Sequence, residues 1–286
     1  MKRIFHIVLG VSVSLVMLAA PQSISYQVFK DGNGNNIKYL CNTDLKTAEV
    51  SYVTEDDATG GVYPRKNFII HNTVALEQTG QTMGGATGMV TITMDVVGFG
   101  ENAFYQAKAT SITFPTSGKF AYIRKQGMAE MKNMKGTLTL PNGLKEIDEK
   151  GLFSGTTGGK MPVTKLVIPA SVDSLGKSAV VLNQLTEIEF LGTTPPKVYD
   201  DGNGVLPWTI SKTSAYNTPK DIKITYPQGA DEAYKSAPGI STYFTQLQSG
   251  TAIGNAKVAV APATKSLRNG MLIIERNGVK YTPTGQ

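Results

Sequence analysis

A pattern of large apolar and small residues recurs four times along the chain. Each copy has a large apolar residue, three variable residues, a small residue and a second large apolar residue, as in Phe99 to Phe104, Ile123 to Met128, Ile147 to Leu152 and Leu175 to Val180. The first residues of successive copies are 24, 24 and 28 positions apart. A period of this length is typical of proteins built from stacked structural repeats. The spacing therefore predicts a solenoid.

Four short strands are expected, over 111–114, 137–140, 165–168 and 187–190. The first three precede the second, third and fourth copies, and the last follows the fourth copy. Each strand has apolar residues two positions apart, which places them on one face. Proline follows most of these strands and marks where they end, because it lacks a backbone donor. Stacked repeats should pair these strands in parallel and align Phe114, Leu140, Ile168 and Phe190 in one buried ladder. Each such residue, fully buried, contributes roughly 1.5 to 3 kcal/mol.

These motifs resemble the BspA-like leucine-rich repeats of bacterial surface proteins. The stretch from Val97 to Phe104 is similar to the family signature, with Phe99 where isoleucine is usual. The segment Thr193–Pro196 and the segment from Ile222 through Tyr234 to Phe244 resemble the unit that closes such arrays, although Ile240 stands where tryptophan is common. The resemblance implies an α/β solenoid of leucine-rich repeat type, mostly β. Its short parallel strands would be joined by turns or short helices.

Composition shifts divide the chain into five parts. We expect a signal peptide over 1–25, a β-rich N-terminal cap over 26–95 and the solenoid with its closing strand and helix over 96–245. A linker rich in small and polar residues follows over 246–264, and a C-terminal β-hairpin tail over 265–286. Two Asn-Gly pairs flank the apolar run of that tail, which indicates tight turns.

The first residues have the pattern of a secretory leader. Lys2 and Arg3 precede an uncharged apolar stretch from Ile4 to Ala20. A transmembrane anchor is the alternative, but the stretch is at the bottom of the spanning range. Cleavage after Ala20 or nearer Ser23 or Ser25 fits the sequence, and no membrane span is then left. We therefore expect a secreted or surface-exposed protein.

The tail adds a second resemblance. It is similar to the carboxy-terminal β-tails of exported proteins from the same bacterial group, some of which serve in sorting to the outer surface. This resemblance implies a Gram-negative bacterium as the source. The chain ends at Gln286, short of the basic and aliphatic residues that usually follow. A structural tail that packs on the last repeat is the preferred alternative.

The distribution of charge argues against nucleic acid as a partner, and the cysteine content rules out internal disulfides. The formal net charge of +6 comes from scattered basic residues, without the basic stripe and interleaved aromatics of nucleic-acid-binding proteins. Cys41 is the only cysteine, so no internal disulfide can form, and a small buried apolar role in the cap is expected for it. No nucleic acid is expected as a partner.

Three motifs resemble cofactor or metal sites but lack essential parts. Gly98 to Ala103 matches a dinucleotide fingerprint, yet no acidic residue lies between Glu101 and Glu130 to bind a ribose. The loop that starts at Asp31 resembles a calcium loop, with Asn36 and Asn42 where glycine and glutamate are needed. The similar loop Asp200–Gly204 is expected to be a polar turn as well. No cofactor is predicted, although an adventitious cation at Asp31 stays open.

Residues for nucleophilic catalysis are scarce. Outside the leader the chain has one thiol, Cys41, and one imidazole, His71, and a thiol protease needs such a pair in contact. A zinc site of the usual type needs more ligands than these two residues supply. Ser154 lacks the flanking glycines of a nucleophile elbow. The sequence therefore predicts a protein that is not an enzyme.

An insertion from Val198 to Pro219 interrupts the repeats and contains the only tryptophan, Trp208, near Tyr199 and Tyr216. Insertions in solenoids often gather on the binding face, so these three aromatics are the candidate binding residues. In the alternative, Trp208 closes the end of the apolar core. The leading functional hypothesis is adhesion or binding of a protein or extracellular matrix ligand. Glycan capture by the aromatics and a structural role in a surface assembly are the alternatives.

Overall fold

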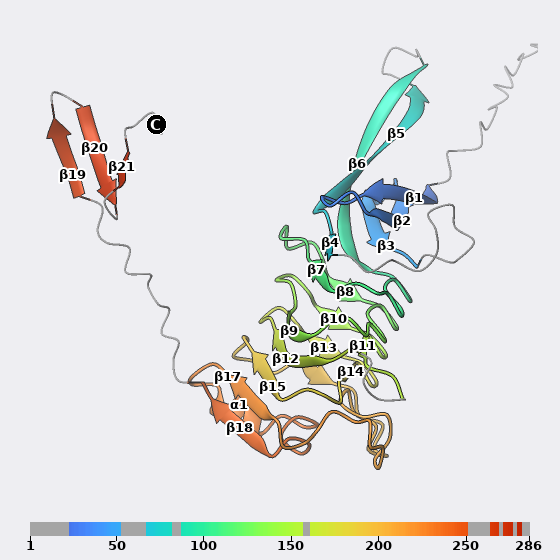
Figure 1. Ribbon diagram of the computed structural model, residues 1–286, viewed down its shortest axis with the longest axis vertical. Helices are drawn as coiled ribbons and strands as arrows, with labels where there is room; N and C mark the ends of the chain where they lie inside the picture. Colours follow the sequence, from blue (N-terminus) through green and yellow to red (C-terminus); the bar gives the residue numbers. More distant parts are fainter. Residues whose placement is uncertain are drawn as a thin grey trace, which may run out of the picture.

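The fold is mostly β. The computed structural model describes residues 23–52, 67–81, 87–156 and 161–250, and the strand backbones at 264–268, 271–276 and 279–281. Within these residues several sheets contain parallel strands, and the one helix has five residues (Figure 1). None of the described helices has the length and apolar composition needed to cross a bilayer. The predicted leader falls on residues 1–22, outside the description, and stays a prediction.

The recurring apolar residues stand in register on a stack of parallel strands. The strands are β6 (Thr87–Phe99), β8 (Tyr122–Ile123), β10 (Glu146–Ile147), β13 (Ser174–Leu175) and β16 (Lys197–Val198). Their pairing aligns Phe99, Ile123, Ile147, Leu175 and Val198 in one row. The first four of these side chains are almost fully buried. Successive copies therefore pair in parallel along this row, in addition to the strands that the sequence predicted.

A second ladder runs through the small residue of each copy. Backbone N–H groups of Phe104, Met128 and Leu152 donate to carbonyls of the next copy at 2.8 to 2.9 Å. In the copies that begin at Ile147 and Leu175 this contact continues over two residues, which form the paired strands β11 (Leu152–Phe153) and β14 (Val180–Val181). The residue before each small residue is left-handed in every copy, with φ between 54° and 57°, at Asn102, Gln126, Lys150 and Ser178. Each copy therefore turns in the same way.

The size of the small residue in each copy is related to branching at Cβ of the large residue four positions earlier. A methyl group on Gly151 would lie 2.6 Å from Ile147 Cγ2, and one on Gly127 would lie 2.9 Å from Ile123 Cγ2. The copies that begin with Phe99 and Leu175 lack this branch at Cβ and have Ala103 and Ala179 instead. A β-branched residue in the row therefore requires glycine at the turn.

A five-stranded parallel sheet forms another side of the array. It consists of β9 (Gly136–Thr139), β12 (Val163–Ile168), β15 (Glu187–Phe190), β17 (Lys223–Tyr226) and β18 (Gln246–Ser249). The pairing aligns an inner row of Leu138, Leu166, Ile188, Ile224 and Leu247. All but Leu247 are buried. Leu140, Ile168 and Phe190 are also buried in the same core, as predicted.

The first predicted strand departs from this ladder. Phe114 follows β7 (Ser111–Thr113), which pairs in parallel with β4 (Asn67–Ile69) of the N-terminal part and forms a separate two-stranded sheet. The prediction that Phe114 continues the row of the later strands is therefore wrong. Phe114 still packs against the common core, with its ring 5.7 Å from the rings of Phe99 and Phe120.

The described residues of the N-terminal part lie mostly in strands. It contains β1 (Ile24–Lys30), β2 (Asn36–Asn42), β3 (Thr47–Val50), β4, β5 (Thr73–Gln81) and β6. The strand β3 pairs with β6, so the N-terminal sheet continues into the repeat row. Asp31 fastens the β1–β2 turn to β4, because its carboxylate accepts N–H bonds from Asn33, Asn35 and Ile69 at 2.7 to 2.9 Å.

The C-terminal part of the array closes with β17, the helix α1 (Asp231–Lys235) and β18. A strand and a helix thus lie in the segment that resembles a closing unit in sequence. Residues 246–249 were predicted as the start of a linker, but they form the fifth strand, β18, in parallel with β17. The tail forms three antiparallel strands, β19 (Thr264–Arg268), β20 (Met271–Arg276) and β21 (Val279–Tyr281), where the sequence predicted a hairpin. These strands pair only with one another among the described residues, so the packing of the tail on the last repeat stays a prediction.

Candidate functional site

The outer side of the five-stranded sheet carries a row of charged residues. Strand pairing places Lys165 beside Glu187 and Glu187 beside Lys223, on three neighbouring strands. Because side chains alternate along a strand, these residues point away from the buried row of Leu166, Ile188 and Ile224. We call the outward side chains Lys165, Glu187, Glu189, Lys223 and Thr225 the charged face.

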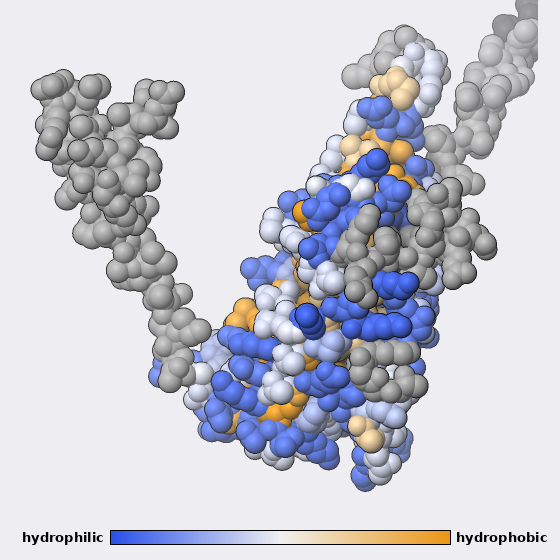
Figure 2. All heavy atoms as spheres, viewed as in Figure 1, coloured by the Kyte–Doolittle hydropathy of each residue, from blue (hydrophilic) through white to orange (hydrophobic). Residues whose placement is uncertain are grey.

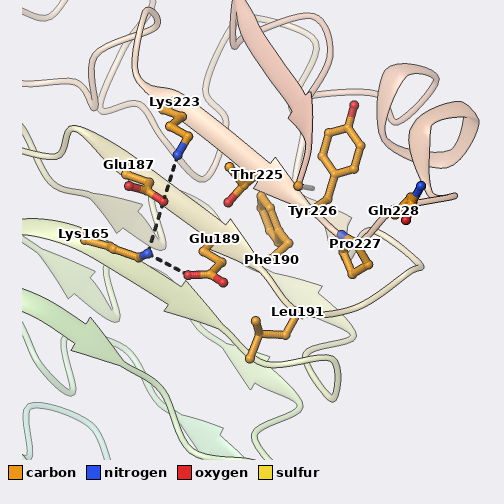
Figure 3. A pocket seen from close by; sticks show the side chains of 11 residues that line it. Lys165, Glu187, Glu189, Phe190, Leu191, Lys223, Thr225, Tyr226, Pro227 and Gln228 are labelled. Atoms are coloured by element: carbon orange, nitrogen blue, oxygen red, sulfur yellow. Dashed lines mark ion pairs between the residues drawn. The ribbon is translucent and has the colours of Figure 1, made fainter. Parts of the chain in front are cut away.

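Ion pairs hold the charged face in one arrangement (Figure 3). Lys165 Nζ lies 2.7 Å from Glu189 Oε2 and 3.2 Å from Glu187 Oε1, and Lys223 Nζ lies 3.7 Å from Glu187 Oε1. The hydrogen bond to Glu189 is the main cause that raises the pKa of Lys165, with Glu187 adding to it and burial opposing it. Partly exposed pairs of this kind contribute at most about 1 kcal/mol each. Their main effect is to fix the positions of these charges on the sheet face.

A cleft of about 580 Å³ lies beside these charges. Its other wall is apolar and includes Phe190, Leu191, Tyr226 and Pro227 (Figure 3). Leu191 is 45% exposed, so the cleft offers apolar surface next to ordered charges. The helix α1 supports this wall, because the ring of Tyr234 stacks on Tyr226 at 4.5 Å with an angle of 3°.

A second hollow, of about 480 Å³, lies at the loop that starts with Asp200. The carboxylates of this loop bind their own backbone. Asp200 accepts the N–H of Gly202 at 2.8 Å, and Asp201 accepts those of Asn203 and Val205 at 2.9 and 3.1 Å. The loop is therefore the polar turn that the sequence predicted. Among the described residues no group of histidine, cysteine and acidic side chains is arranged to hold a metal ion.

The three predicted binding residues do not form a surface site. Trp208 is completely buried, its Nε1–H donates to the carbonyl of Gly239 at 3.0 Å, and its ring lies 4.9 Å from that of Phe244. Its burial agrees with the alternative in which it closes the core and corrects the hypothesis of an exposed indole. Tyr199 and Tyr216 are exposed by 41% and 37%. They are left without the tryptophan that would have completed an aromatic platform.

Cys41 and His71 have separate surroundings. Cys41 lies in the core of the N-terminal part, and burial raises the pKa of its thiol to about 11. An activated nucleophile needs the opposite shift. His71 Nε2 lies 3.2 Å from the carbonyl oxygen of Lys30. The hydroxyl of Ser154 is buried and lies 3.3 Å from Asn183 Oδ1.

The charged face was not among the predicted site residues. The alternation of apolar and polar residues showed that Glu187 and Glu189 point outward, but it did not show which side chains lie beside them on the next strands. Aligning Leu166, Ile188 and Ile224 as neighbours brings Lys165 and Lys223 to Glu187. This alignment is the signal that could have identified the site.

Comparison with known proteins gives little further information. No protein-family model matches the chain, and no curated protein does. A solved structure, that of the pneumococcal vaccine antigen PcpA, is similar over 87% of this chain, with 14% sequence identity and a TM-score of 0.34. The chain spans 54% of the length of that structure.

Proposed function

We propose that the chain is a BspA-like leucine-rich repeat solenoid that acts, without catalysis, as a binding module outside the cell. Two observations support the repeat assignment. The recurring large residues pair in register from one copy to the next, and each copy has a left-handed residue at the same place in its turn. The leader-like first residues support export, and the resemblance of the tail to those of exported proteins supports a Gram-negative bacterium as the source.

The charged face and its cleft are the proposed binding surface for a protein or extracellular matrix ligand. The observation that carries this proposal is the cleft of about 580 Å³ between ordered charges and an apolar wall. Protein interfaces combine an apolar centre with a polar rim in this way. The lining residues lie on an exposed sheet face, with Leu191 45% exposed, which suits a macromolecule better than a small metabolite that is mostly enclosed.

The proposed site is balanced in charge, because two lysines face two glutamates. A partner that pairs with one sign must compete with the ion pairs already present. We therefore expect specificity to come from the order of the charges along the three strands. The apolar wall at Leu191 would supply most of the affinity.

Binding of the purified mature protein to immobilised extracellular matrix proteins tests the proposal. The variant with Lys165→Glu and Lys223→Glu should bind about tenfold more weakly, because four like charges then share the face. Lys197→Glu is the matched control, since Lys197 is exposed on β16 of the other sheet, and it should bind as the unchanged chain does. Saturable binding that the double variant retains would refute the assignment of the site. Absence of saturable binding to any matrix protein would refute the proposed function.

A further inference from the structure

The outermost strand of the N-terminal part exposes a row of large apolar residues. In β1, Ile24, Tyr26 and Val28 are exposed by 51%, 59% and 46%. Within the described residues β1 pairs only with β2, so its other edge is open. Figure 2 shows a largely hydrophilic surface elsewhere on the viewed side, apart from a few hydrophobic patches. An open strand edge lined with apolar residues is unusual for a monomeric protein.

The backbone groups that point away from β2 at this edge belong to the same residues and to Lys30. The N–H of Thr43 donates to the carbonyl of Ser23, and the N–H of Asp31 donates to that of Asn35. Because bonding direction alternates along an antiparallel strand, Ser25, Gln27 and Phe29 face β2. The backbone groups of Ile24, Tyr26, Val28 and Lys30 therefore face outward.

Nothing in the sequence of β1 protects this edge. Native proteins usually blunt an open edge with proline, a bulge or charges along the strand. Residues 24–29 contain no charge and no proline, and the pairing of β1 with β2 is regular over all seven residues. The strand has its one charge, Lys30, at its end.

We propose that in the chain cleaved after Ala20, which keeps all of β1, this strand pairs antiparallel with β1 of a second copy about a two-fold axis at Gln27. This register places Tyr26 opposite Val28 of the second copy and Ile24 opposite Lys30 of the second copy. All four residues with outward backbone groups then form hydrogen-bonded pairs. Moving the axis to Tyr26 or Val28 leaves the groups of at least one of the four unpaired. The strand is thus complementary to itself in one register.

Charge and side-chain contacts favour the same register. Each Lys30 lies opposite an uncharged Ile24, so no like charges meet directly across the strands. Tyr26 and Val28 form an aromatic and β-branched cross-strand pair on each side of the axis, an arrangement that stabilises antiparallel strands. One strand pair buries less surface than a standard stable interface, so the dimer should form reversibly and depend on concentration.

A single cysteine at the axis tests the register. Gln27 faces its own copy there in a pair without hydrogen bonds, with Cα atoms about 4.5 Å apart, which a disulfide can span. The Gln27→Cys variant of the chain that begins at Pro21 should form a covalent dimer under mild oxidation. Ser25→Cys is the matched control on the same side of the strand, because its two copies would lie about 14 Å apart. The unchanged chain is a second control, since its only cysteine, Cys41, is buried.

Sedimentation of the reduced protein over a range of concentrations tests the association itself. The chain should shift from monomer to dimer as concentration rises. Val28→Pro removes an outward N–H and should abolish this shift, while Leu45→Lys, which changes an apolar residue that is 71% exposed outside β1, should leave it intact. A chain that stays monomeric overturns the proposal. So does a covalent dimer that Ser25→Cys forms as readily as Gln27→Cys.

Discussion

The contact between Gly151 and Ile147 allows a sharp test of how the repeats pack. A methyl group at Gly151 would lie 2.6 Å from Ile147 Cγ2, whereas ordinary contacts begin at 3.4 Å. Gly151→Ala should therefore overpack the core, at a cost of roughly 1 to 3 kcal/mol. Alanine also lowers the conformational entropy of the unfolded chain relative to glycine, which stabilises the folded state by about 0.4 to 1 kcal/mol. We expect a net loss of about 1 to 2 kcal/mol in the free energy of unfolding.

The copy that begins at Leu175 indicates the compensating change. There leucine, which lacks the methyl branch at Cβ, stands four positions before Ala179. Ile147→Leu alone conserves volume and should cost less than about 1.5 kcal/mol. Combined with Gly151→Ala it should recover most of the loss, so that the two changes are coupled favourably by about 1 to 2 kcal/mol.

Urea unfolding of the four chains measures this coupling. Circular dichroism follows the sheets, and the fluorescence of the buried Trp208 gives a second signal. Agreement between the two signals supports a two-state analysis. The reasoning is refuted if Gly151→Ala stabilises the protein, which is the result expected of the entropy alone. It is also refuted if the loss in the double variant equals the sum of the single losses.

Three further changes probe other parts of the fold. Trp208→Ala should lower the free energy of unfolding by about 3 to 5 kcal/mol, because it leaves a cavity and an unpaired carbonyl at Gly239, as denaturant unfolding followed by circular dichroism would show. At Asp31, burial opposes ionisation, but hydrogen bonds from Ile69, Asn35 and Asn33 outweigh it and lower the pKa. The ionised Asp31 therefore contributes its full stabilisation above the ordinary pKa near 3.8, and this contribution is lost as pH falls through the lower pKa of the folded state. Asp31→Asn should remove this pH dependence from acid unfolding curves. Lys150→Gly should raise the melting temperature slightly, because glycine adopts a φ of 56° without strain, and an unchanged or lower value would contradict this account.

The sequence alone was sufficient where one copy could be compared with the next. The recurring strands that carry Leu140, Ile168 and Phe190 were predicted to pair in parallel, and β9, β12 and β15 do so, because residues at equivalent places occupy equivalent positions. It failed for β18, since Gln246–Ser249 contains one apolar residue and a single residue shows no alternation. The pairing of β7 with β4 was missed because the partner lies more than forty residues earlier in a segment without the repeat pattern.

The candidate site was harder to predict for a related reason. The aromatic residues around Trp208 are neighbours in sequence, but they lie in an irregular insertion where sequence does not reveal which side chains are buried. The charges of the proposed site are distant in sequence and become neighbours only through strand register. Lys165 and Glu187 are 22 residues apart, and Lys223 follows 36 residues later.

The equal spacing of the first three copies has a consequence for how the length of the protein can change. Deletion of residues 123–146 would bring Ile147 to the place of Ile123, with its turn, its left-handed residue and its backbone donors in the same relation to Phe99. The next step, from Ile147 to Leu175, is 28 residues long, so removal of that copy keeps the row only if 28 residues are lost. Gene rearrangement can therefore shorten or extend this part of the molecule by whole copies, of 24 codons for the first two, without a change in the segments on either side.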